Sequence, residues 1–168
     1  NSFNVLWLRK LDGFSASSRT TTPDKAISIA SKSSSSSSSN PSAFTMLLGN
    51  LYGLAVEAIK YGVILDNELF NKFKEDALKD IESIIEQCVY LKGQIVSEDE
   101  FDKGQRQLLN FGHTIGHAIE KCSSFTIPHG FAVAMGMIAI TRASENSGLC
   151  EKGSLKLLEE VLQKYKLP

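Results

Sequence analysis

All three histidines of this 168-residue chain lie between Arg106 and Gly130. His113 and His117 are four residues apart, so in a helix they share one face, with Cβ atoms about 5–6 Å apart. His129 follows after a short connection. Imidazole nitrogens that converge are typical zinc ligands, and a catalytic zinc takes three protein ligands and keeps one position open. The stretch therefore predicts a metal site.

Two glycines in the same stretch support this prediction. Gly112 and Gly116 each precede a histidine, and glycine inside a helix is about 0.5–1 kcal/mol less favourable than alanine. Such glycines indicate close approach by another backbone or by a ligand. Arg106 and Asn110 follow the same helical spacing, so a helix over 105–121 is predicted to carry a guanidinium, an amide and two imidazoles on one face. A helix face that carries this many polar groups indicates a binding or catalytic site.

The spacing of the histidines alone favours His113, His117 and His129 as the three ligands. The competing interpretation is a structural helical bundle in which the three side chains fill the core and have their ring nitrogens satisfied by neighbours. That interpretation predicts no bound metal and little loss on replacing His113.

The elements that must position these residues have helical periodicity. The apolar spacing predicts one helix over 51–65 and a second over 69–91, which Asp66 can cap at its N-terminus. A polar connection over 93–104 precedes the histidine helix. Further helices are predicted over 132–147 and 155–165. Five helices and no strand pattern predict an all-α helical bundle.

The first fifty residues differ in composition from the rest. The tract Ser31–Ser39 is serine apart from Lys32, and such a tract cannot bury enough apolar surface to offset its ordering entropy. We expect a low-complexity segment over 1–50 and a helical domain over 51–168. No Gly-x-Gly-x-x-Gly and no βαβ pattern occurs, so we expect no nucleotide-binding domain in this sequence.

Composition narrows the class of protein further. Lys and Arg number 18 against 19 Asp and Glu, and a net charge of −1 gives no general argument for nucleic acid or an anionic membrane as a partner. Cys88, Cys122 and Cys150 have no Cys-x-x-Cys spacing, which favours reduced thiols in a cytoplasmic protein. No apolar run reaches the roughly 18 residues of a membrane span, and charges interrupt the N-terminal apolar residues, so no signal peptide is expected.

The histidine stretch resembles the signature of a known enzyme family. From Arg106 to Glu120 it has the pattern Arg-x-x-x-Asn-Phe-Gly-His-Thr-x-Gly-His-Ala-Ile-Glu, and His129-Gly follows. This pattern is similar to that of the dehydroquinate synthases, the second enzymes of the shikimate pathway of aromatic amino acid biosynthesis. The resemblance runs from about Leu51 to the C-terminus. Other sugar phosphate cyclases share part of the pattern, and metal-dependent polyol dehydrogenases share its general architecture.

The resemblance implies a specific set of metal ligands. Zn²⁺, or another divalent ion such as Co²⁺, would be bound by Glu57, His113 and His129. Glu57 thus takes the place that spacing alone gives to His117. In the family, the residue matching His117 lies beside the metal and handles substrate and protons. Glu120 also belongs to the signature, and we expect it to orient a ligand or to be structural.

The other residues that the resemblance selects suit an acidic phosphorylated sugar. Arginine presents a planar fork that matches carboxylate and phosphate oxygens, and lysine supplies a point charge. Lys60 shares a helix face with Glu57 at spacing i, i+3, and Lys92 follows the second predicted helix. The expected catalytic and substrate-binding residues are His117, Lys60, Lys92, Arg106 and Asn110.

The reaction that the resemblance implies is a lyase reaction without net redox change. The seven-carbon sugar acid phosphate DAHP is oxidised transiently by NAD, loses phosphate, takes its hydride back and closes to dehydroquinate. The metal acts as a Lewis acid on the alcohol that is oxidised. Since we expect no NAD domain here, we predict that this sequence is the metal-binding half of such an enzyme and is inactive alone. We also predict that an exposed helical face associates with the missing NAD-binding domain or with a second copy.

Three features depart from the family pattern. Gly53-Leu-Ala-Val-Glu57 has one residue more than the usual Gly-x-Ala-Glu, Phe131 stands where the family commonly has glutamate, and the sequence ends at Pro168 before a late basic residue. Two alternatives therefore stay open. One is another sugar phosphate cyclase or a polyol dehydrogenase, and the other is a non-catalytic helical module that keeps a metal site.

Overall fold

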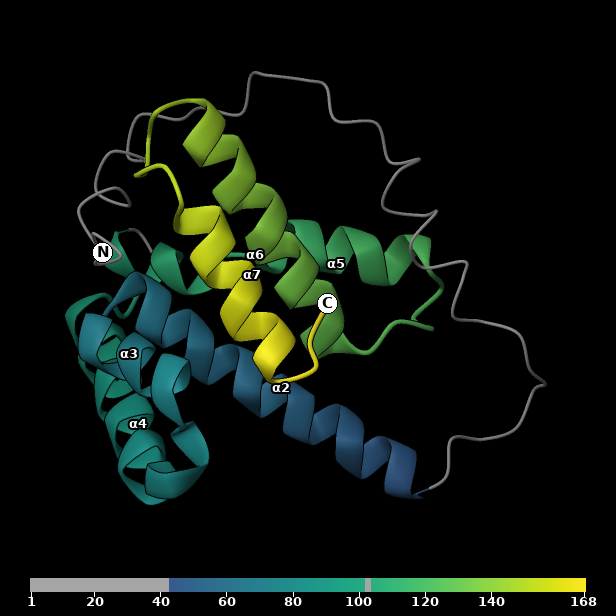
Figure 1. The fold of residues 1–168 in the computed structure, drawn as a ribbon, viewed down its shortest axis with the longest axis horizontal. Helices are drawn as coiled ribbons and strands as arrows, with labels where there is room; N and C mark the ends of the chain where they lie inside the picture. The colour runs from purple at the N-terminus through teal and green to yellow at the C-terminus, as the bar shows by residue number, and fades with distance from the viewer. Residues whose placement is uncertain (1–42, 102–103) are drawn as a thin grey trace.

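The structure, a computed structural model, describes residues 43–101 and 104–168. Within these ranges it has six α-helices, two 3-10 helices and no strand (Figure 1). The predicted all-α fold is confirmed for this part of the chain, whereas the low-complexity segment predicted for 1–50 falls mostly outside it. The elements are α2 (Ala43–Ile64), α3 (Asn67–Glu75), η2 (Ala77–Asp80), α4 (Ile81–Glu98), η3 (Gln105–Asn110), α5 (His113–Cys122), α6 (His129–Asn146) and α7 (Ser154–Lys164).

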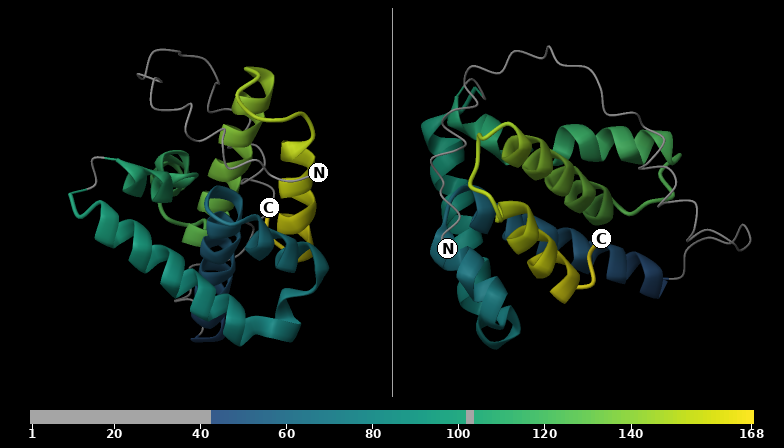
Figure 2. Two further views of the ribbon diagram at one scale, coloured as in Figure 1. Left: turned by 90° about the vertical axis from the view of Figure 1, so that its left-hand side faces the viewer. Right: turned by 45° about the horizontal axis from the view of Figure 1, so that its top comes forward.

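Helix α6 is the centre of the bundle. It packs against α5, α2 and α7, and Figure 2 shows α6 and α7 side by side. Its buried positions are mostly small, among them Ala132, Ala134 and Ser144, so neighbouring helices approach closely. Leucines of α7 and branched residues of α2 complete the core around it. This arrangement brings α2 and α5, which are far apart in sequence, to the same central helix.

Glycines make the contact between α5 and α6 unusually close. A Cβ on Gly136 of α6 would lie 2.0 Å from the carbonyl oxygen of Gly112, and a Cβ on Gly116 would lie 3.1 Å from Cα of Val133. No Cβ fits at Gly136, and a Cβ at Gly116 would require its neighbour to move by a few tenths of an ångström. The close backbone approach predicted from Gly112 and Gly116 is therefore confirmed.

The prediction of one continuous helix over 105–121 was wrong. Residues 105–110 form the 3-10 helix η3, and α5 begins only at His113. Gly112, between them, has a φ of +80°, in the left-handed region that glycine enters without steric cost. Because this residue redirects the chain, Arg106 and Asn110 do not continue the helical face of His113 and His117.

The second predicted helix, over 69–91, is also interrupted. It divides at Asp76 into α3 and α4, with η2 between them. The cause lies at the far end of the chain, where Lys164 Nζ donates to the carbonyl of Lys74 at 2.9 Å and Tyr165 Oη donates to that of Phe73 at 3.0 Å. These bonds satisfy the last carbonyls of α3, so the helix ends there. Helix α4 in turn runs to Glu98, through the first half of the predicted connection.

Other predicted helix boundaries agree more closely with the structure, except that α2 begins at Ala43, eight residues before the predicted start at residue 51. Oδ1 of Asp66 accepts hydrogen bonds from the backbone N–H of Glu68 at 2.8 Å and of Leu69 at 3.2 Å, so the predicted cap is confirmed. Helix α6 begins at His129, three residues before the predicted start, and α7 lies where a last helix was predicted. Within the described ranges, no helix is both long enough and apolar enough to cross a membrane.

Candidate metal centre

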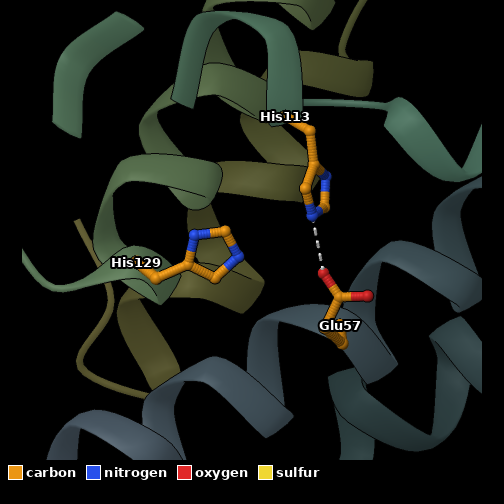
Figure 3. A group of neighbouring side chains, drawn as sticks. All are labelled: Glu57, His113 and His129. Atoms are coloured by element: carbon orange, nitrogen blue, oxygen red, sulfur yellow. Dashed lines mark ion pairs between the residues drawn. The ribbon is translucent and has the colours of Figure 1, made fainter. Parts of the chain in front are cut away.

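Three helices bring Glu57, His113 and His129 together. Glu57 comes from α2, whereas His113 and His129 are the first residues of α5 and α6 (Figure 3). One donor atom from each lies within 4.8 Å of the others. The rings of His113 and His129 have centroids 5.5 Å apart. The fold therefore gathers two imidazoles and a carboxylate at one place, although their assignment as ligands stays a prediction.

The contact between Glu57 and His113 lacks a hydrogen-bond donor in the neutral state. Nδ1 of His113 lies 3.3 Å from the carbonyl oxygen of Phe111, so this nitrogen carries the proton of that bond. In a neutral ring, Nε2 then has a lone pair, and it lies 3.2 Å from Oε1 of Glu57. Among the described residues no donor satisfies this buried oxygen. Two facing acceptors fit a bound cation between them.

Lys60 holds the other oxygen of the same carboxylate. Its side chain is 3% exposed, and Nζ donates to Oε2 of Glu57 at 2.7 Å and to the carbonyl of Leu109 at 2.8 Å. The prediction that Glu57 and Lys60 share a helix face is confirmed. Burial raises the pKa of Glu57, but His113, which can donate to it once its ring is protonated, and the charge and hydrogen bond of Lys60 lower this pKa to about 2 overall. Glu57 is therefore an ionised carboxylate at neutral pH.

His117 lies beside these three residues but is not brought to Glu57. Its Nδ1 lies 2.9 Å from Oε2 of Glu120, whose Oε1 lies 3.1 Å from Nδ1 of His129. The side chains of His117 and His129 are 62% and 47% exposed. The interpretation in which the three histidines fill a core is therefore wrong. Burial raises the pKa of Glu120, but the hydrogen bonds from the two histidines outweigh it and lower the pKa overall.

The cations predicted to bind substrate occupy different environments. Lys92 is exposed on α4. The pKa of Lys60 is lowered by the burial of Lys60 and, to a smaller extent, by the charge of Lys92, whereas Glu57 partly offsets both effects. The guanidinium of Arg106 donates to the carbonyl of Glu100 at 3.0 Å. Asn110 is exposed at the end of η3. Their roles toward a substrate stay predictions.

Two backbone carbonyls take part in the site without any signal in the sequence. The carbonyl of Leu109 accepts from Lys60, and that of Phe111 accepts from His113. Every residue carries such a group, so no residue type marks them. The left-handed Gly112 that orients this segment was visible only as a glycine expected to be in close contact.

An all-helical domain that gathers two imidazoles and a carboxylate from three helices belongs to the class of domains suited to a divalent cation. Comparison of the sequence with known protein families identifies the family within this class. Residues 53–168 match the family described as 3-dehydroquinate synthase C-terminal. This match covers more than half of the chain, and the chain belongs to that family.

Curated proteins similar to this chain are named 3-dehydroquinate synthase. The 3-dehydroquinate synthase of Clostridium beijerinckii is 47% identical over 118 residues, which are 67% of this chain and 34% of that protein. The 3-dehydroquinate synthase of Sulfurisphaera tokodaii is 43% identical over 124 residues, 69% of this chain and 35% of that protein. The chain thus spans about a third of the length of the curated relatives it matches.

Proposed function

We propose that the described helices are the metal- and substrate-binding part of a 3-dehydroquinate synthase, a lyase that converts DAHP to dehydroquinate with loss of phosphate. The observation that carries this proposal is the donor-free contact between Oε1 of Glu57 and Nε2 of His113, with His129 beside it. Family membership adds the reaction class. The set that spacing alone favours, with His117 in place of Glu57, has less support because it is Glu57 that has a ligand atom within 4.8 Å of one atom each of His113 and His129.

The ion held there would be Zn²⁺ or another divalent ion such as Co²⁺. Two neutral imidazoles and one carboxylate are a common zinc donor set, which leaves a position for substrate oxygen. When bound, the ion supplies Lewis acidity toward a substrate hydroxyl. Lys60 holds Glu57 in place from the opposite oxygen. His117 is exposed beside the site, where its second ring nitrogen is available to take a proton.

The substrate we propose is an anionic sugar acid phosphate. Arg106 and Lys92 supply positive charge and Asn110 supplies an amide, and all three reach solvent at least in part. Lys60 is buried and already bonded, so its contribution is to the ligand Glu57 first. NAD would come with a domain outside the described helices, as a partner or as further chain, and a second copy is the other partner we propose. Three free thiols support a cytoplasmic location.

Metal binding by the purified 168-residue chain tests the site itself. We expect about one zinc per chain by elemental analysis and calorimetry. His113→Ala should lose this zinc because it removes one of the three proposed ligands and leaves only Glu57 and His129. Thr114→Ala, an exposed neighbour on the same helix, is the matched control and should keep it. A chain that takes up no zinc, or a His113→Ala variant that binds as well as the control, contradicts the proposed site.

Phosphate release tests the reaction. The chain would be mixed with DAHP, NAD, zinc and the part of the Clostridium beijerinckii relative that this chain does not match. We expect phosphate release only from the complete mixture, without accumulation of NADH, because the hydride returns to the substrate. Accumulation of NADH from a diol would indicate a polyol dehydrogenase. A chain that binds zinc, associates with the added part and releases no phosphate would be a non-catalytic metal-binding module.

A further inference from the structure

One carboxylate joins two of the three histidines. Glu120 lies on α5, and its side chain is only 12% exposed. Oε2 lies 2.9 Å from Nδ1 of His117, and Oε1 lies 3.1 Å from Nδ1 of His129. His117 is on the same helix, whereas His129 opens α6. Each oxygen of this largely buried group thus meets one imidazole, and the two imidazoles come from different helices.

The direction of these bonds fixes where the protons are. An ionised carboxylate only accepts hydrogen bonds, so Nδ1 of both His117 and His129 must donate. In a neutral imidazole the other nitrogen, Nε2, is then left with its lone pair. Figure 3 shows a ring nitrogen of His129 turned toward Glu57 and His113. The rings of His117 and His129 are stacked, with centroids 5.7 Å apart.

We infer that Glu120 is a positioning residue that sets both the tautomer and the ring orientation of His117 and His129. It acts from α5 on a proposed metal ligand of α6, so it also ties the two helices together at the site. Its effect on metal affinity rests on the proposed function. Its effect on the tautomers rests only on the two hydrogen bonds.

Glutamine at this position has nearly the same shape but different hydrogen bonding. Its amide offers one accepting oxygen and one donating nitrogen, so it can accept from only one of the two Nδ1–H groups. The imidazole that faces the amide nitrogen must turn or move its proton to Nε2. For His129, a proton on Nε2 occupies the lone pair that a metal ion needs.

Histidine tautomers in the metal-free chain are the first measurement. Long-range ¹H–¹⁵N correlation spectra at mildly alkaline pH distinguish Nδ1–H from Nε2–H rings, and single histidine-to-alanine variants assign the three signals. We expect Nδ1–H for His117 and His129 in the unsubstituted chain. In Glu120→Gln at least one of the two should change to Nε2–H. Nε2–H rings at both positions in the unsubstituted chain would overturn the inference without any variant.

Zinc affinity is the second measurement, made by competition with a chelator. We expect Glu120→Gln to weaken binding by about 10–100-fold, the usual effect of losing a group that orients a ligand. His117→Ala should bind zinc nearly as well as the unsubstituted chain, because Glu120 influences zinc affinity by orienting His129 and not His117. Glu160→Gln, an exposed glutamate on α7, is the matched control. Circular dichroism checks that each variant is folded.

The outcomes separate this inference from the proposed function. If the unsubstituted chain binds no zinc, the proposed function fails, while the tautomers still decide the role of Glu120. If zinc binds and Glu120→Gln leaves both affinity and tautomers unchanged, the inference fails alone. A second zinc equivalent that disappears in Glu120→Gln would also overturn it, because Glu120 would then be a metal ligand together with His117 and His129.

Discussion

The ammonium group of Lys60 shows how one side chain can serve a site without reaching solvent. It bonds both to Glu57 and to the carbonyl of Leu109, so it connects a proposed metal ligand with the segment η3. The same two bonds compensate for the burial of its charge. A lysine with this environment differs from Lys92, although the sequence suggested a similar role for both.

We expect Lys60→Met to lower the unfolding free energy of the metal-free chain by about 1–3 kcal/mol, because it leaves a partly buried carboxylate and a carbonyl without their donor. Urea denaturation at neutral pH measures this change. The matched variant Lys92→Met removes an exposed charge and should change stability by less than about 0.5 kcal/mol. Equal stability of the two variants would show that the buried bonds contribute nothing measurable.

At the scale of elements, the crossing of α5 and α6 depends on glycine. Gly136 lies against the carbonyl of Gly112, the residue that directly precedes α5. Since His113 and His129 start these two helices, the crossing sets their separation. A change in this contact would therefore alter the distance between His113 and His129.

Gly136→Ala should prevent native packing, because its Cβ would meet a backbone oxygen at 2.0 Å and neither helix can shift without losing its partner. We expect a loss of more than about 3 kcal/mol, seen as a lower thermal midpoint and lost zinc binding. Gly93→Ala, inside α4 with nothing within 4 Å of the added Cβ, is the control. It should be stabilising by about 0.5–1 kcal/mol. A Gly136→Ala chain as stable as the control would contradict the packing described.

Local patterns predicted the helices better than their interruptions. The cap at Asp66 and the pairing of Glu57 with Lys60 follow from short spacings, so both were visible in the sequence. The break at Asp76 depends on Lys164 and Tyr165, which no local pattern connects to it. Tertiary contacts thus decided where a favourable helical stretch ended.

The candidate site was likewise predictable from the sequence only in part. Spacing alone favoured three histidines as ligands, and only the family resemblance selected Glu57. The structure brings Glu57 to His113 and turns His117 toward Glu120. A glycine such as Gly112 fits either a helix interior or a left-handed turn, so the sequence could not show that Arg106 leaves the helix.

At the scale of the whole molecule, α4 presents apolar side chains to solvent. Ile81, Ile85 and Val89 are four residues apart on its outer side, and each is more than half exposed. Three apolar side chains in register form a contiguous surface that favours association. In the isolated chain the available partner is a second copy.

We expect the isolated chain to self-associate as its concentration rises, because pairing of two α4 helices removes this surface from water. Sedimentation velocity measures the distribution of species. The double variant Ile85→Lys with Val89→Lys should stay monomeric. Glu86→Lys, an exposed charge reversal on the same helix, controls for the change in charge and should still associate. A chain that is monomeric throughout the concentration range would contradict this expectation.

The division of the donors among helices also affects how quickly an ion would exchange. His113 and His129 come from the closely packed pair α5 and α6, whereas Glu57 arrives on α2. Helix α2 meets α6 where Gly130 lies against Gly53 and where Tyr52 and Phe131 have ring centroids 5.1 Å apart. If an ion is held by all three donors, we expect it to dissociate when this contact opens. Its residence time would then depend on the packing of α2 against α6.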